Sequence, residues 1–278
     1  MIFESFEKEY EMQESEYLVL MSDEGGSGSG SEPYVVAQAY FLAYIDIQTN
    51  ELKHAEGRLS WPVESKEAKT RKYFNRFHKG GIYHIKACKL IDTTVPEGRL
   101  ASFYNNLYVK EVLAEKISNP ILEGILAEYR KPVILQDEVL GELILNKDLG
   151  LFNGSTNWLE TKIRITLDVD KDSKTSWTKA RNAMKKFLTE QQKWDIQMRR
   201  FAADKLTALA NEWQDEENED APDISEEDFA KRISIQDISM TSGGSFSVYF
   251  DDDDMFWGHT VTVDGTLRKG ITNANMEG

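Results

Sequence analysis

Residues 177–213 read WTKARNAMKKFLTEQQKWDIQMRRFAADKLTALANEW, and this stretch sets the architecture of the C-terminal half. Its apolar side chains recur at steps of three and four residues, with one gap at Gln191. That period is typical of an α-helix with one apolar face, and it predicts a single helix of about 55 Å at roughly 1.5 Å per residue. We expect the apolar face to form core, and the alternative is a partner-binding or dimerising face.

Short strands are predicted on both sides of this helix. Hairpin turns are expected at Asn153-Gly154, Gly243-Gly244 and Asp264-Gly265. The strands are expected at residues 133–136, 140–145, 158–169, 235–240, 245–250 and 257–263. This order predicts an α+β domain over residues 132–278, an antiparallel β-meander packed on one long α-helix.

Residues 1–95 are predicted to form a small β-barrel-like domain with short helices. Alternating apolar and polar residues indicate strands at 17–21, 34–47, 51–61 and 82–91, an order compatible with an oligonucleotide-binding-type or an SH3-like barrel. The Gly- and Ser-rich residues 23–33 predict a flexible loop. A helical connector is expected over residues 96–131, with helices at 100–117 and 121–129.

The charge is large and unevenly distributed. The 278 residues include 33 Lys and Arg against 48 Asp and Glu, a formal net charge of −15. Residues 136–278 carry 17 basic and 28 acidic side chains, whereas residues 66–89 carry eight basic side chains and one Glu. The electrostatic field of this negative charge repels nucleic acid from most of the surface and attracts cationic partners. It leaves one basic segment that could bind an anion.

Several classes of protein do not fit this composition. No apolar stretch reaches the roughly 18–20 residues of a membrane-spanning helix, and the acidic N-terminus is unlike a secretory signal, so we expect a cytoplasmic protein without membrane contact. Cys88 is the only cysteine, which excludes a disulfide framework. Nucleophile-elbow, phosphate-loop, dinucleotide-binding and His-Glu-x-x-His motifs are absent from the sequence, so no cofactor is expected and an enzyme is the less favoured class.

An acidic run beside two aromatic residues is the most conspicuous candidate site. Four carboxylates and an imidazole could bind a cation, but the alternate spacing of an EF-hand loop is missing and the other histidines belong to the N-terminal domain, so no metal site is assigned. An exposed turn and a docking surface for a basic partner are the alternatives. The candidate residues are Asp251, Asp252, Asp253, Asp254, Phe256, Trp257 and His259.

The basic segment is a second candidate, with Tyr73, Phe74, Phe77 and Tyr83 among its cations. Single-stranded nucleic-acid binders combine cations for phosphates with aromatic rings for bases. The same aromatic residues would also suffice as an ordinary helix core, and the cations could face the acidic domain instead. The candidate anion-binding residues are Lys69, Arg71, Lys72, Arg76 and Lys79.

The C-terminal half also carries a family resemblance. Leu140-Gly141-Glu142, the run 149–154, Trp158 and the ending Phe-Asp-Asp-x-Asp-x-Phe-Trp-Gly-His at 250–259 resemble the bacterial domain-of-unknown-function family numbered 2262, over roughly residues 132–278. In relatives we expect a Gly where this chain has Asp253. The resemblance implies a bacterial, cytosolic setting and supplies no catalytic residues.

Three functional hypotheses follow. The preferred one is a non-enzymatic cytosolic bacterial protein-binding protein of the immunity type, whose acidic C-terminal domain docks on a basic partner such as a toxin, since small acidic α+β proteins are frequent among immunity proteins. The alternative is a nucleic-acid or anion-binding module that uses residues 66–89. The third is a metal-dependent hydrolase centred on residues 251–259. The sequence carries no signal for an oligomeric state.

Overall fold

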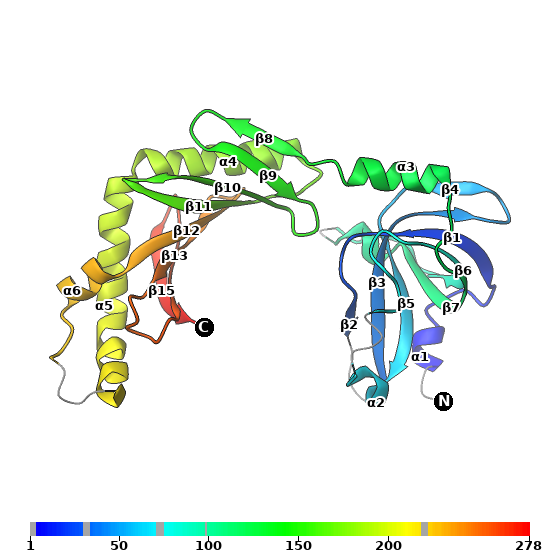
Figure 1. Cartoon of the computed structure of the whole chain (residues 1–278), viewed down its shortest axis with the longest axis horizontal. Coiled ribbons are helices and arrows are strands. Elements are labelled where there is room, and N and C mark those ends of the chain that lie inside the picture. Colours follow the sequence, from blue (N-terminus) through cyan, green and yellow to red (C-terminus); the bar gives the residue numbers. More distant parts are fainter. Residues whose placement is uncertain (1–3, 30–33, 71–74, 98, 218–221) are drawn as a thin grey trace. The chain divides into compact units, whose positions relative to one another are not determined.

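The chain folds into two compact units, Met1–Lys131 and Pro132–Gly278 (Figure 1). The structure is a computed structural model, and it describes residues 4–29, 34–70, 75–97, 99–217 and 222–278. The α+β class predicted from the sequence is confirmed. None of the helices in these described ranges is long and apolar enough to cross a membrane.

A closed five-stranded barrel forms the centre of the first unit. Its strands pair in the order β1-β6-β7-β5-β3 and back to β1, and only β5 and β7 are parallel. Counted along the chain this is the order 1-2-3-5-4-1, the Greek-key order of an oligonucleotide-binding-type barrel, which is one of the two barrel types expected. The strands are β1 (Ser15–Met21), β3 (Tyr34–Asp46), β5 (Gly57–Glu64), β6 (Ile82–Lys89) and β7 (Asn106–Ala114).

The flexible loop expected over residues 23–33 is wrong in part. Residues Ser27–Ser29 form a strand, β2, which pairs with Val36–Gln38 of β3, and the Ser27 hydroxyl lies 3.0 Å from the Tyr40 hydroxyl. Backbone hydrogen bonds to β3 need no particular side chains, so a Gly/Ser segment can add a strand there. Residues 30–33 lie outside the described ranges.

The helix expected over residues 100–117 is also wrong. A short 3-10 helix, η2 (Ala101–Phe103), is followed by β7, whose Leu107 and Val109 are buried in the barrel. Pairing with both β5 and β6 overrides the local helical pattern. The expected connector is therefore part of the barrel up to Ala114. The second helix expected there is α3 (Pro120–Tyr129), which starts where the Asn119 side chain accepts hydrogen bonds from the amides of Ile121 and Leu122.

The core of the first unit lies inside the barrel, and a smaller apolar cluster and a few short elements lie outside it. The barrel interior is filled by large side chains, among them Tyr17, Phe41, Leu59, Trp61 and Ile85. On the outside of the barrel, Leu122 of α3 packs with Leu20, Leu42 and Ile82. The short elements are α1 (Glu4–Glu7), β4 (Glu51–Lys53) and α2 (Ser65–Ala68).

An eight-stranded sheet forms the second unit, with its strands side by side in chain order. All neighbours are antiparallel except β11 and β12, which are parallel because three helices connect them. The predicted meander is thus confirmed, with one parallel step. The strands are β8 (Ile134–Asp137), β9 (Gly141–Asn146), β10 (Leu151–Trp158), β11 (Thr161–Asp168), β12 (Ser234–Thr241), β13 (Ser245–Asp251), β14 (Thr260–Thr266) and β15 (Gly270–Glu277).

Two predicted hairpin turns lie inside strands. Asn153-Gly154 belongs to β10 and Asp264-Gly265 to β14. Glycine is needed there for space, because a Cβ on Gly154 would lie 2.8 Å from the Glu142 carbonyl oxygen, and one on Gly265 would lie 2.5 Å from the Phe246 ring. Glycine is typical both of a tight turn and of a place where another chain segment comes close, so the residue type does not separate the two.

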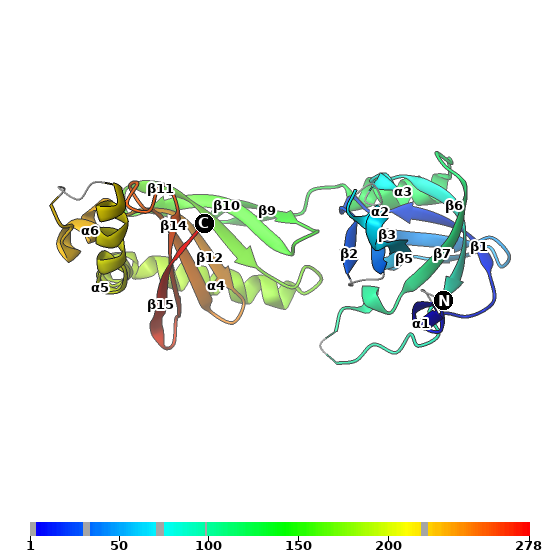
Figure 2. The same cartoon turned by 90° about the horizontal axis from the view of Figure 1, so that it is seen from below.

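The single helix expected over residues 177–213 is two helices. They are α4 (Lys174–Thr189) and α5 (Gln191–Glu217), separated at Glu190, and they run in clearly different directions (Figure 1, Figure 2). The break falls beside the gap in the apolar pattern, and the Gln191 side chain accepts a hydrogen bond from the Leu159 amide. A long helix, α5, packs against the sheet as predicted, on β14 and β15, while α4 packs on β11 and β12. The short α6 (Glu226–Arg232) packs on α5.

A buried carboxylate fastens the β8–β9 turn to α4. Asp137, whose side chain is 4% exposed, accepts hydrogen bonds from the amides of Val139 and Leu140 and pairs with Lys185 at 3.2 Å and Arg181 at 3.7 Å. Burial by itself would raise the pKa of Asp137, but the hydrogen bonds and Lys185 hold that pKa below its ordinary value of 3.8.

This carboxylate predicts a pH-dependent part of the stability. Because the pKa of Asp137 is lowered by folding, its contribution is fully present above pH 3.8 and is lost as the pH falls through the lower folded value. Asp137→Asn should reduce the free energy of unfolding by about 1–2 kcal/mol at pH 7. Urea unfolding of both proteins at pH 7 and below pH 4 measures this, and a difference that does not shrink at low pH contradicts it.

Candidate functional site

The acidic run forms the turn between β13 and β14, and its backbone is unusual. Asp253, Asp254 and Trp257 adopt left-handed conformations, with φ of 49°, 64° and 57°. Aspartate tolerates this region better than most residues, and glycine adopts it freely. Relatives are expected to carry Gly at the position of Asp253, and the backbone conformation of Asp253 is one that glycine also adopts.

Two of the candidate residues are buried and hold the turn together. Asp252 is 2% exposed, and its carboxylate accepts hydrogen bonds from the amides of Phe256 at 2.6 Å and Asp254 at 3.3 Å. Phe256 is fully buried in the core. Neither side chain is available to a partner or a metal ion, since the first caps its own turn and the second packs inside.

The other carboxylates of the run lie at the surface with different partners. Asp251 accepts a hydrogen bond from the Gln236 side chain at 2.9 Å, and Asp253 pairs with Arg232 at 2.7 Å. Asp254 is exposed and forms no ion pair with any residue of the described ranges. Among the described residues, neither Asp251 nor Asp254 has a cationic partner, and both are exposed.

Trp257 stands on the surface in the same turn, where its backbone amide donates to the Asp254 carbonyl oxygen at 3.4 Å. Its side chain is 52% exposed, and its ring lies 4.6 Å from that of Trp213 near the end of α5. Trp213 also contacts Phe256 at 5.8 Å and His259 at 5.3 Å between ring centroids. His259 donates from Nδ1 to the Phe256 carbonyl oxygen, so this ring supports the turn.

The fold also brings the end of α5 to the same place. Exposed Glu212 precedes Trp213, and the backbone of residues 215–217 continues α5 directly after it. We call Trp257, Trp213, Glu212, Asp251 and Asp254 the Trp257 surface. The helical pattern predicts Trp213 as part of the core face, and Trp213 does pack against the core. Its contact with Trp257 has no sequence signal, because helical period alone does not say where a helix leaves the sheet.

Residues 137–276 match a family described as uncharacterized proteins conserved in bacteria, DUF2262. The chain belongs to this family. The Trp257 surface lies wholly within the DUF2262 domain, and the resemblance stated from the sequence is confirmed. Residues 2–129 match a second domain of unknown function, DUF7021. No curated protein and no solved structure matches this chain.

The cations proposed for anion binding, outside the DUF2262 domain, do not form one described site. Arg71 and Lys72 lie outside the described residues, and Lys69 and Lys79 are exposed. The guanidinium of Arg76 lies 5.0 Å from the Trp61 ring, and burial lowers the pKa of Arg76. Arg76 thus packs against the barrel in the described structure.

The outer face of β3, β5 and β7 is covered by the protein itself. Oligonucleotide-binding barrels bind their ligands on this side. Here Phe6 and Tyr10 pack on Tyr108, at ring distances of 4.9 and 5.4 Å, and the Glu7 carboxylate accepts hydrogen bonds from Tyr108 and from Lys110 at 3.2 Å. Burial raises the pKa of Tyr10 to about 12. The N-terminal residues therefore cover Tyr108 and Lys110 on this side of the barrel.

The described residues hold no group of three or more His, Cys, Asp or Glu side chains placed to bind a metal ion. Cys88 is buried beside Phe6 and Tyr108, and burial raises the pKa of its thiol, which disfavours the reactive thiolate. The geometry therefore gives no support to the metal-dependent hydrolase hypothesis.

Proposed function

We propose that this protein binds a basic partner protein through the Trp257 surface. The observation that carries the proposal is the half-exposed Trp257 ring, which packs on Trp213 at 4.6 Å in the turn that also carries the exposed carboxylates of Asp251 and Asp254. Interface hot spots are typically aromatic residues at the centre of a polar rim, and carboxylates at the rim steer a cationic partner. The turn that holds Trp257 is internally hydrogen-bonded, so little ordering remains to be done on binding.

The finer part of the proposal concerns the partner. We propose a cytosolic protein of the immunity type whose partner is a toxin with a basic, nucleic-acid-binding cleft. Carboxylates can take the place of phosphates in such a cleft, and the acidic net charge of residues 136–278 favours encounter with it. A toxin gene directly upstream of the gene for this chain would support this choice, and inhibition of that toxin by the purified protein would test it.

The charge at the rim predicts a change in association rate. The immobilised full chain is used to recover basic proteins from the producing bacterium and its neighbours, and binding kinetics are then measured for the double variant Asp251→Asn/Asp254→Asn. We expect the association rate constant to fall by about threefold or more at low salt and much less at high salt, because steering is screened.

A matched control has the same change in charge at another place. Glu138 and Glu160 are exposed in turns of the same unit, so Glu138→Gln/Glu160→Gln removes two charges away from Trp257. This control should keep most of the wild-type rate at low salt. The proposal fails if no basic protein is recovered, or if both double variants slow association equally.

A further inference from the structure

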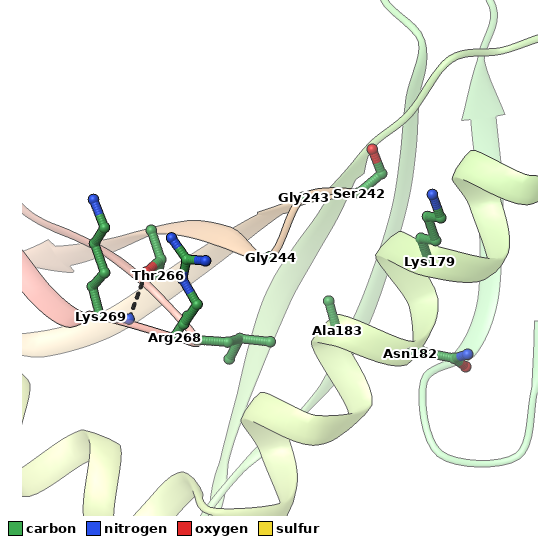
Figure 3. Close-up of a pocket in the computed structure, with 10 residues that line it drawn as sticks. Lys179, Asn182, Ala183, Ser242, Gly243, Gly244, Thr266, Arg268 and Lys269 are labelled. Carbon is green, nitrogen blue, oxygen red and sulfur yellow. Dashed lines mark hydrogen bonds between the residues drawn. The ribbon is translucent and has the colours of Figure 1, made fainter.

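The DUF2262 domain contains a hollow of about 600 Å³ that lies between α4 and two hairpin turns (Figure 3). One turn joins β12 to β13 and the other joins β14 to β15. The Leu267 amide donates to the Gly244 carbonyl oxygen at 2.9 Å, so the two turns are fastened to each other. The hollow is of the size that small-molecule sites have, roughly 300–1,000 Å³.

Three cations line this hollow, one from the helix and two from the second turn. They are Lys179, Arg268 and Lys269, and their side chains extend to the same side in Figure 3, whereas Asn182 points away from the turns. The hydroxyl groups of Ser242 and Thr266 also line it. Ammonium, guanidinium and hydroxyl groups are the donors that bind phosphate oxygens in proteins.

These cations have no counter-charge among the described residues. The residues that line the hollow include no Asp or Glu, although residues 136–278 carry 28 acidic side chains. Two other cations of α4, Arg181 and Lys185, are paired with Asp137. Three like charges that share one hollow repel one another, and a bound anion would relieve this repulsion.

We infer that this hollow is a binding site for a small molecule that carries a di- or polyphosphate group. Phosphate oxygens can be bound by Lys179 on one wall and by Arg268 and Lys269 on the other. Two linked phosphate groups can therefore contact more of these cations than a single phosphate group can. The surrounding net charge of −11 disfavours long polyanions, because these would extend over acidic surface. The site lies on residues separate from the Trp257 surface and does not depend on the proposed function.

Calorimetric titration of the full chain with inorganic pyrophosphate tests this site. We expect saturable binding with one site per chain, and inorganic phosphate should bind at least about tenfold more weakly. In the variant Lys179→Ala/Arg268→Ala, pyrophosphate affinity should fall by about tenfold or more, since both side chains that donate charged hydrogen bonds to the phosphate oxygens are removed. The three residues are exposed, so the variant should remain folded.

The control variant is Lys162→Ala/Lys186→Ala, which removes two exposed cations of the same unit outside the hollow. It should bind pyrophosphate as the wild type does. The inference is overturned if pyrophosphate does not bind, if phosphate binds equally well, or if the two double variants behave alike. Binding of the partner protein, measured without pyrophosphate, should be the same for Lys179→Ala/Arg268→Ala as for the wild type. This keeps the test separate from that of the Trp257 surface.

Discussion

Replacing Asp195 with alanine is expected to lower the free energy of unfolding of the DUF2262 domain by about 3–5 kcal/mol. Asp195 lies on α5 with its side chain 12% exposed, and it accepts hydrogen bonds from the Trp158 indole at 3.0 Å and from Arg199 Nε at 2.8 Å. Arg199 in turn donates to the carbonyl oxygens of Ala230 and Ile233 at the end of α6. One carboxylate thus connects the sheet, α5 and α6.

The loss is large because two donors are left behind. Trp158 is 1% exposed, so its indole N–H would have no water to replace the carboxylate, and Arg199 would lose its counter-charge in a largely buried place. Denaturant unfolding followed by tryptophan fluorescence measures the effect, since Trp158 itself reports on this contact. Asp195→Asn keeps an acceptor for Trp158 and should cost less than Asp195→Ala.

Asp204→Ala is the matched control for this experiment. Asp204 lies on the same helix and pairs with Lys205, but its side chain is 61% exposed. Surface ion pairs contribute about 0–1 kcal/mol, so this variant should unfold nearly as the wild type does. If Asp195→Ala costs no more than Asp204→Ala, the network does not hold α5 and α6 to the sheet.

Trp257→Ala is expected to weaken binding of the partner by about 2–4 kcal/mol, which corresponds to a roughly 30- to 1000-fold rise in Kd. The indole ring is half exposed and already packed on Trp213, so it presents a rigid apolar surface at little cost in conformational entropy. The effect should lie in the dissociation rate, because a central aromatic contact slows release. Surface plasmon resonance on the recovered partner separates the two rate constants.

The control is a residue of similar exposure on α5. Ile196 is 61% exposed, and it is 17 residues before Trp213 along the helix, about 25 Å at 1.5 Å per residue. Ile196→Ala should leave Kd unchanged. A dissociation rate of Trp257→Ala within about twofold of that of Ile196→Ala would mean that Trp257 is not the anchor.

The candidate site was only partly visible in the sequence. The run 251–254 marks a surface turn, but residues of the same type differ in burial there, since Asp252 is buried and Asp254 is exposed. The sequence does not distinguish between four adjacent aspartates, whereas the backbone conformation of the turn, with its left-handed φ angles, sets which carboxylates face inward. The hollow beside Lys179 and Arg268 had no sequence signal, because these residues are 89 positions apart in the chain.

The α+β class, the barrel-like first half, and the sheet with a long helix in the second half could all be predicted from the amino-acid pattern, because apolar periodicity records which faces must be buried. Long-range packing determines that residues 106–114 close the barrel as β7 and that the helix breaks at Glu190. It also determines that Trp213 meets Trp257. Each of these depends on which distant strand or helix supplies the partner surface, and pairing energy between distant segments outweighs the local propensity of either one.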